Sequence, residues 1–188
     1  MKIVVCITGA SGMLYAKRLL ESLSVCKGVD LHLVISEAAG ALIRDELSVP
    51  AKALEKLAGR CYKNCDLGAP ISSGSVKFDA MVVIPASMST LSKMACGISD
   101  NLITRLGAVA LKERRRLVLV PRETPLSPIH LENMHRLSLS GAIIIPACPG
   151  FYNGPRTLDD LADNMASRVL DLLGVENECA PRYPKKRK

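Results

Sequence analysis

The sequence predicts a single α/β domain in which helices cover both faces of a doubly wound, mostly parallel sheet, a flavodoxin-like or Rossmann-like three-layer sandwich. Five apolar runs rich in Val and Ile recur without polar alternation, as strands buried on both faces require. Amphipathic segments separate these runs. A chain of 188 residues with 48% hydrophobic content is long enough to bury one core and too short for two comfortable ones.

Strands and helices are predicted to alternate along almost the whole chain. The predicted strands span residues 2–8, 30–36, 79–85, 116–121 and 142–146. The predicted helices span residues 13–24, 37–47, 99–113, 128–139 and 157–173, and residues 87–90 stand ahead of another helix. Residues 48–78 carry the weakest pattern.

Polar residues mark the expected starts of these helices. Ser36 and Ser99 are natural N-caps, because a short hydroxyl accepts hydrogen bonds from the free N–H groups of a first turn. Thr157 and Asp160 form a capping signal, and Pro128 suits the first position of a helix.

The net charge of +7 is concentrated at the C-terminus. Five basic residues and no acid follow Cys179: Arg182, Lys185, Lys186, Arg187 and Lys188. Without them residues 1–178 carry a charge of +2, so the body is not a nucleic-acid surface, and an aromatic content of 3% argues against base stacking. We expect a domain over residues 1–175 and a basic tail over residues 176–188. The tail is expected to be a disordered end that aids solubility rather than a site for acidic partners.

Cysteine and histidine usage indicates a reducing cytoplasm and no metal. Most of the seven cysteines lie in apolar runs, where thiols act as small hydrophobes. Cys61 and Cys65 are the only close pair, without a second pair at zinc spacing, and His130 and His135 do not share a helical face. No apolar run approaches the roughly 20 residues of a membrane span, and the first run continues into a glycine loop, which favours a strand over a signal peptide.

Ligands of such folds bind at the carboxyl ends of the strands. The first strand ends in Thr8–Gly12 (TGASG), a loop whose glycines let a phosphate approach the backbone before a helix N-terminus. A dinucleotide site is disfavoured, because a third glycine is missing, Ser36 replaces the acidic residue that grips a ribose, and no Tyr-x-x-x-Lys pair occurs. A tight turn without a ligand remains the alternative.

Three later segments also carry candidate ligand groups. The hydroxyls of Ser87–Thr90 suit a second phosphate or a heterocycle edge, or serve only as an N-cap. Arg105 and Lys112 are seven residues apart on one helical face, directed either toward a phosphate or into solvent. The adjacent cation and anion Arg122 and Glu123 follow the fourth strand between prolines that stiffen the loop.

Together these segments resemble one family, the UbiX-type flavin prenyltransferases, long described as aromatic-acid or 3-polyprenyl-4-hydroxybenzoate decarboxylases. The resemblance runs from about Lys2 to Gly174. It rests on TGASG, SSGS (72–75), the Pro-x-Ser-x-x-Thr-Leu run (85–91), LKERR (111–115), LVPRETPLS (119–127), IHLENM (129–134) and PGFY (149–152). Ala86 and Asn153 depart from the family pattern, in which Cys and His are common, without removing a catalytic group.

The resemblance implies a flavodoxin-like homododecamer whose substrates are reduced FMN and dimethylallyl monophosphate. The dimethylallyl group is joined first to N5 of the flavin and then to C6, without a metal. The product, prenylated FMN, is the cofactor of a partner UbiD-type decarboxylase.

The resemblance also assigns the residues of the site, which neighbouring subunits share. The FMN-binding residues by match are Gly9, Ala10, Ser11, Ser36, Ser87, Met88, Ser89, Thr90 and Arg105. The residues that hold the donor phosphate are Lys112, Arg122, Tyr152 and Arg168, beside Glu123. Ser11 and Glu46 remove protons around the flavin, and with Lys112 and Glu123 they form the catalytic set. Glu46 would otherwise be interpreted as surface charge.

Two other functions stay open. One is an FMN-dependent decarboxylase of the cysteine-decarboxylating type, although the Pro-x-Met-Asn motif of those enzymes is absent. The other is a non-catalytic flavin-binding subunit that serves a phenolic-acid decarboxylase. The sequence leaves undecided whether the donor is a monophosphate or a pyrophosphate, and whether the product serves quinone synthesis or phenolic-acid breakdown.

Overall fold

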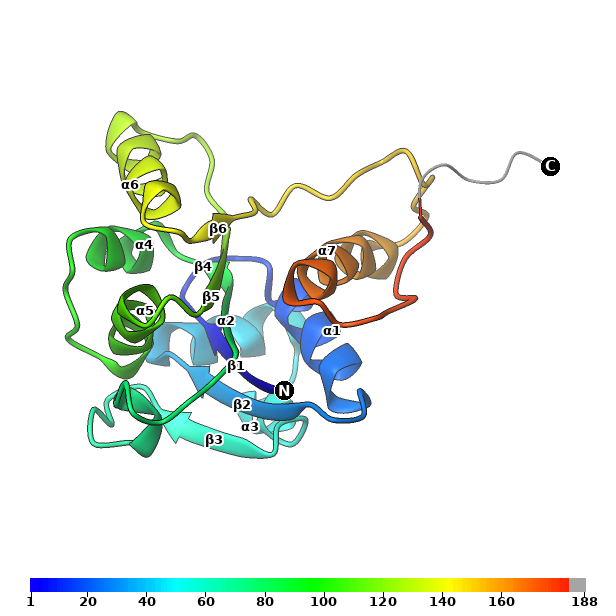
Figure 1. Ribbon diagram of the computed structural model, residues 1–188. Coiled ribbons are helices and arrows are strands. Elements are labelled where there is room, and N and C mark those ends of the chain that lie inside the picture. The colour runs from blue at the N-terminus through cyan, green and yellow to red at the C-terminus, as the bar shows by residue number, and fades with distance from the viewer. Residues whose placement is uncertain (183–188) are drawn as a thin grey trace.

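A six-stranded parallel sheet organises the computed structural model, which describes residues 1–182 (Figure 1). Its strands are β1 (Lys2–Ile7), β2 (Asp30–Ile35), β3 (Arg60–Lys63), β4 (Ala80–Ala86), β5 (Arg116–Pro121) and β6 (Ile143–Ile144). Their order in the sheet is β3-β2-β1-β4-β5-β6, and every pair is parallel. This is the Rossmann order, and without the edge strand β3 it becomes the flavodoxin order, so the predicted fold class is confirmed.

Helices cover both faces of the sheet. One face carries α1 (Met13–Ser24), α2 (Glu37–Leu47), α3 (Ala51–Glu55) and α7 (Leu158–Leu173). The other carries α4 (Met88–Ala95), α5 (Leu102–Lys112), α6 (Pro128–Leu139) and a 3-10 turn (Pro70–Ser72). Figure 1 shows α1 and α7 on one side of the strands and α4, α5 and α6 on the other.

The buried strands explain why the sequence runs show no polar alternation. Along β1, Ile3 and Val5 pack against α1 and α7, whereas Val4 and Cys6 pack against the α4 and α5 side. All four side chains are fully buried, so both faces of the strand select apolar residues.

The structure corrects three predicted elements. The helix expected at Ser99 begins at Leu102, because Asn101 rather than Ser99 caps it: its Oδ1 accepts from the N–H of Thr104 at 3.1 Å. The strand expected at 142–146 contains only Ile143–Ile144. Residues 48–78 hold the strand β3 and the helix α3, which the pattern missed because β3 is short, polar and mostly exposed at the sheet edge.

The first part of the predicted tail packs on the body. Arg182 forms two hydrogen bonds with the carboxylate of Asp171 on α7, one at 2.8 Å, and Asn153 Nδ2 donates to the carbonyl of Pro181 at 2.7 Å. This part therefore differs from the free end that its composition indicates. The remaining basic residues, at 185–188, lie outside the described residues.

Candidate active site

The loops after β1 and β4 meet at the switch point of the sheet, where successive connections run in opposite directions. Buried Thr8 joins them: its Oγ1 donates to the carbonyl of Pro85 at 2.8 Å and accepts from the N–H of Ser87 at 2.7 Å. These hydrogen bonds fix the glycine loop and the hydroxyl-rich loop side by side. Sequence reasoning missed Thr8 as the joining residue, although it directly follows the first apolar run.

The glycine loop lies close to the start of α2. A Cβ added at Gly9 would lie 2.7 Å from the Cβ of Ala38, so only glycine fits there without a shift. Gly12 has φ of 111°, in the left-handed region that glycine adopts without strain. The N–H of Ser36 donates to the carbonyl of Ile7 at 3.0 Å, which brings the predicted FMN residues Gly9 and Ser36 to neighbouring strand ends.

The N-terminus of α1, which the sequence predicts as a phosphate site, holds an anion from the chain itself. The carboxylate of Glu46 accepts from the N–H of Gly12 at 2.9 Å and from that of Met13 at 2.8 Å. A carboxylate is favoured there because the first N–H groups of a helix are free and carry partial positive charge. Glu46 is exposed, but its carboxylate is held beside the loop that contains Ser11.

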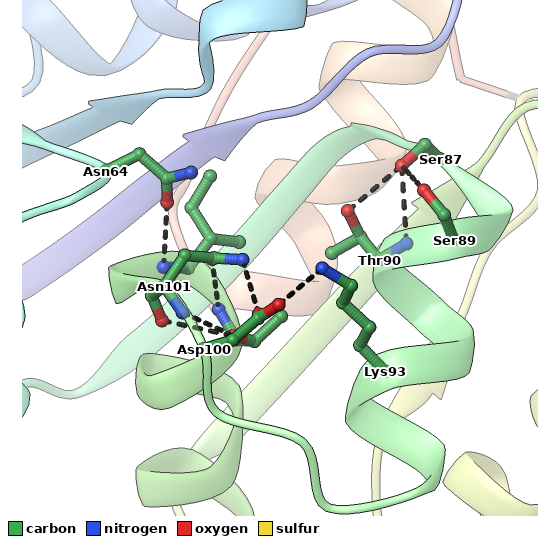
Figure 2. Close-up of polar contacts among 9 residues, drawn as sticks. Asn64, Ser87, Ser89, Thr90, Lys93, Asp100 and Asn101 are labelled. Carbon is green, nitrogen blue, oxygen red and sulfur yellow. Dashed lines mark hydrogen bonds and ion pairs between the residues drawn. The ribbon is translucent and has the colours of Figure 1, made fainter.

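A second helix N-terminus, that of α4, carries only neutral hydroxyls. Ser87 Oγ accepts from the N–H of Thr90 at 3.4 Å and lies 2.9 Å from Thr90 Oγ1 and 3.2 Å from Ser89 Oγ (Figure 2). The first turn holds no acidic residue. Lys93, further along α4, points away to the carboxylate of Asp100 at 2.6 Å. Ser87 is thus an N-cap, as one reading of the sequence predicts, and this end of α4 suits a phosphate better than α1 does.

Arg122 and Glu123 lie at the same edge of the sheet, directly after β5. The N–H of Arg122 donates to the carbonyl of Ala86 at 3.3 Å, and Glu123 Oε1 accepts from the N–H of Thr124 at 3.0 Å. Both side chains are exposed. The predicted cation and anion therefore stand on a loop tied to the end of β4, with their charged groups open to a ligand.

Tyr15 is a neighbour of Arg122 that sequence reasoning missed. Burial raises the pKa of the half-buried Tyr15, Cys148 raises it further and Arg122 lowers it, so its phenol lies within electrostatic reach of both. A Cβ added at Gly12 would lie 2.8 Å from the Tyr15 ring. In the sequence, the position of Tyr15 one turn after the glycine loop could have indicated that it lies near the site.

Tyr152 and Arg168 line one cavity of about 370 Å³ together with Cys148, Gly150 and Asn164. The loop after β6 supplies the first and α7 supplies the second. The structure therefore brings together two of the predicted phosphate ligands that are 16 residues apart in the sequence.

Arg105 and Lys112 do not converge on the strand ends of their own chain. Arg105 Nε donates to the carbonyl of Ser72 at 3.1 Å, and Lys112 pairs with Glu113. Lys112 precedes β5 and Arg122 follows it, and six strand residues put these ends on the order of 16 Å apart. Within one subunit the two cations therefore start from opposite ends of a strand, and Lys112 is directed to Glu113 rather than toward Arg122.

Two further features concern metals and membranes. Within the described part of the chain, no three His, Cys, Asp or Glu side chains gather as metal ligands would. Among residues 1–182, no helix combines the length and apolar character that a membrane crossing needs.

A doubly wound parallel sheet with small and hydroxyl residues at its switch point, and a neutral helix N-terminus there, defines a nucleotide- or flavin-binding protein of the Rossmann-like class. A family model described as Flavoprotein matches residues 1–171. The chain belongs to this family and, by its relatives, to the UbiX-type flavin prenyltransferases within it.

Individual comparisons extend over nearly the whole chain. The flavin prenyltransferase UbiX of Thermoplasma acidophilum is 53% identical over 97% of this chain and 100% of its own. The structure of a dodecameric FMN-dependent UbiX-like decarboxylase from Escherichia coli O157:H7 superimposes with a TM-score of 0.96 at 44% identity, over 98% of this chain and 100% of that one. AnUbiX (PadA1) in complex with FMN and dimethylallyl pyrophosphate also gives 0.96, at 41% identity over 99% and 98%.

Proposed function

We propose that the protein is a flavin prenyltransferase that joins the dimethylallyl group of dimethylallyl phosphate to N5 and C6 of reduced FMN. The observation that carries this proposal is the gathering of Ser11, Glu46, Ser87 and the Arg122–Glu123 pair at one edge of the sheet. The near full-length likeness to UbiX enzymes and to the AnUbiX complex supports the choice of substrates.

The residues at the switch point fit FMN. Gly9 keeps the glycine loop tight against Ala38 at the start of α2, and the N-terminus of α4 offers Ser87, Ser89 and Thr90 hydroxyls to a phosphate. Ala10, Ser11, Ser36 and Met88 belong to the same strand ends, and Arg105 of a neighbouring subunit would complete the set. Bound reduced FMN supplies the nucleophilic N5 and C6.

Cations would stabilise the departing phosphate of the donor. Breaking the allylic C–O bond sends the electron pair to the phosphate, whose growing charge Arg122, Arg168 and Lys112 are suited to bind. Tyr152 would add a phenolic hydrogen bond, and Glu123 would share a proton with the leaving oxygen. The sum of the reaction takes one proton from N5 and one from C6, adds one to the prenyl double bond and releases one with the phosphate.

Glu46 and Ser11 are proposed to handle the protons at the flavin. Glu46 is the acceptor because its carboxylate lies beside the Ser11 loop, held by two backbone N–H groups. Ser11 would relay a proton between flavin and carboxylate, because a hydroxyl both donates and accepts.

The complete site requires more than one subunit. Lys112 lies at the opposite end of β5 from Arg122, so we propose that Lys112 and Arg105 reach the site from neighbouring copies in a homododecamer. The product would pass to a UbiD-type decarboxylase in the cytoplasm. The seven free cysteines support a reducing compartment.

One anaerobic assay tests the proposal. The protein is mixed with reduced FMN and either dimethylallyl monophosphate or pyrophosphate, and the flavin mass is read. We expect a flavin with one added C5 unit. Folded, FMN-bound protein that leaves the mass unchanged contradicts the transferase and favours the non-catalytic binding subunit, whereas release of CO₂ from a peptide with a C-terminal cysteine indicates the decarboxylase alternative.

A further inference from the structure

Helix α7 presents a buried polar side chain to the loop that follows β6. Asn164 is 7% exposed, and its Oδ1 accepts a hydrogen bond from the N–H of Gly150 at 3.0 Å. Arg168 lies one turn further along the same helix and therefore on the same face. Both line the 370 Å³ cavity with Tyr152. One face of α7 thus carries a proposed phosphate ligand and the anchor of the loop that carries another.

Gly150 connects this anchor to Tyr152. A Cβ added at Gly150 would collide with the Tyr152 ring, at 3.0 Å from Cδ1 and closer to Cε1, so the ring folds back against Gly150. A shift of Gly150 therefore moves the surface on which the ring rests. The phenol follows, because it lies at the far end of that ring.

The amide of Asn164 is well suited to hold a loop. A buried amide is unfavourable unless it is hydrogen-bonded, so its oxygen keeps the Gly150 partner. A buried side chain on a helix also has few rotamers to choose from, which makes it a firmer anchor than an exposed loop residue.

We infer that Asn164 is a positioning residue for the donor phosphate, because through Gly150 it fixes the Tyr152 ring beside Arg168. This inference rests on the proposed function. It separates donor binding from flavin binding, since Asn164 lies at the α7 cavity and the hydroxyls proposed for FMN lie at the start of α4.

Asn164→Leu tests this role, because leucine has a similar size and lacks the acceptor. We expect the KM for dimethylallyl phosphate to rise about tenfold, the upper effect of one hydrogen bond, with kcat and the Kd for FMN within about twofold of wild type. Ser167→Ala is the matched control, since Ser167 is buried on the same helix and does not line the cavity. Its KM should not change.

A double-mutant cycle shows whether Asn164 acts through Tyr152. In a Tyr152→Ala background, Asn164→Leu should leave the donor KM unchanged. An equal rise of KM in both backgrounds, or no rise in either, overturns the inference.

Gly150→Ala is a second route that displaces the ring and should raise the donor KM in the same way even if Asn164→Leu does not fold. Wild-type protein that makes no prenylated FMN overturns the proposed function itself, whereas an active wild type with normal KM in these variants overturns only the positioning role.

Discussion

At the scale of single residues, the carboxylates of the site have different surroundings. Both are exposed, but Glu46 accepts from two backbone N–H groups at the start of α1, whereas Glu123 accepts from one, that of the adjacent Thr124. This difference suits the proposed roles of Glu46 as a fixed proton acceptor at the flavin and of Glu123 as a carboxylate that meets the departing phosphate.

Glu123→Gln should abolish most turnover while FMN binding stays intact. The amide keeps the size of the side chain but cannot take up or give the proton, a loss of about 10²- to 10⁴-fold in kcat for a general acid–base group. Single-turnover flavin mass and FMN fluorescence titration measure the two effects. Wild-type turnover in this variant would show that Glu123 has no chemical role.

Gly9→Ala should weaken both folding and FMN binding. The added Cβ meets the Cβ of Ala38 at 2.7 Å, and such overpacking costs about 1–3 kcal/mol. Thermal denaturation with and without FMN measures the change. Gly40→Ala is the control, because nothing lies within 4 Å of a Cβ added at Gly40 in α2. Alanine should stabilise a helix there by about 0.5–1 kcal/mol.

At the scale of elements, caps set where the helices of the site begin. Asn101 and Thr104 form a reciprocal capping box at α5, and Asn64 Oδ1 accepts from the N–H of Ile103 at 3.1 Å (Figure 2). This end of α5 fixes the direction of the helix that carries Arg105 and Lys112.

Asn101→Ala should lower stability by about 1 kcal/mol, because the N–H of Thr104 loses its acceptor. Urea denaturation at equal protein concentration measures it. Asn101→Ser, which keeps a capping acceptor without placing a second carboxylate beside Asp100, should lose less than Asn101→Ala, and equal losses in both variants would argue against the cap.

The contact between the tail and α7 should depend on pH. The hydrogen bonds from Arg182 hold the pKa of Asp171 below its ordinary value. A lowered pKa contributes stability that is present above the unfolded value of about 3.9 and lost as the pH falls through the folded pKa. Arg182→Ala should therefore lower Tm slightly at pH 7, and the difference from wild type should shrink and vanish as the pH falls through the lowered pKa of Asp171. A difference that does not change with pH would assign the effect to packing.

At the scale of the whole molecule, the proposed site draws on two ends of the protomer. Arg122 and Glu123 follow β5 at the carboxyl edge, whereas Lys112 precedes it at the amino edge. The proposed three-cation site would form if the amino edge of one subunit packs near the carboxyl edge of another.

Mixed oligomers test this arrangement. Oligomers made only of Lys112→Ala or only of Arg122→Ala subunits should be inactive. Oligomers assembled from equal amounts of the two should recover about a quarter of wild-type activity. A site is intact there when the Lys112→Ala subunit supplies Arg122 and the neighbouring Arg122→Ala subunit supplies Lys112. Arg122→Ala mixed with Glu123→Gln is the control, because both changes lie on the same edge and leave no intact site. If the first mixture recovers no activity, either Lys112 and Arg122 of the same subunit serve one site, or Lys112 is not a site residue.

The sequence by itself determined the fold class and the strand-end motifs, because burial on both faces of a strand and the backbone needs of a glycine loop leave local patterns. It also predicted the caps Ser36 and Thr157 from adjacent residues. Only the tertiary structure decided that Glu46 fills the N-terminus of α1, that Tyr152 and Arg168 line one cavity, and that Asn164 holds Gly150. The physical reason is that spacing along one element fixes a direction, whereas contact between groups many residues apart depends on how helices and strands pack.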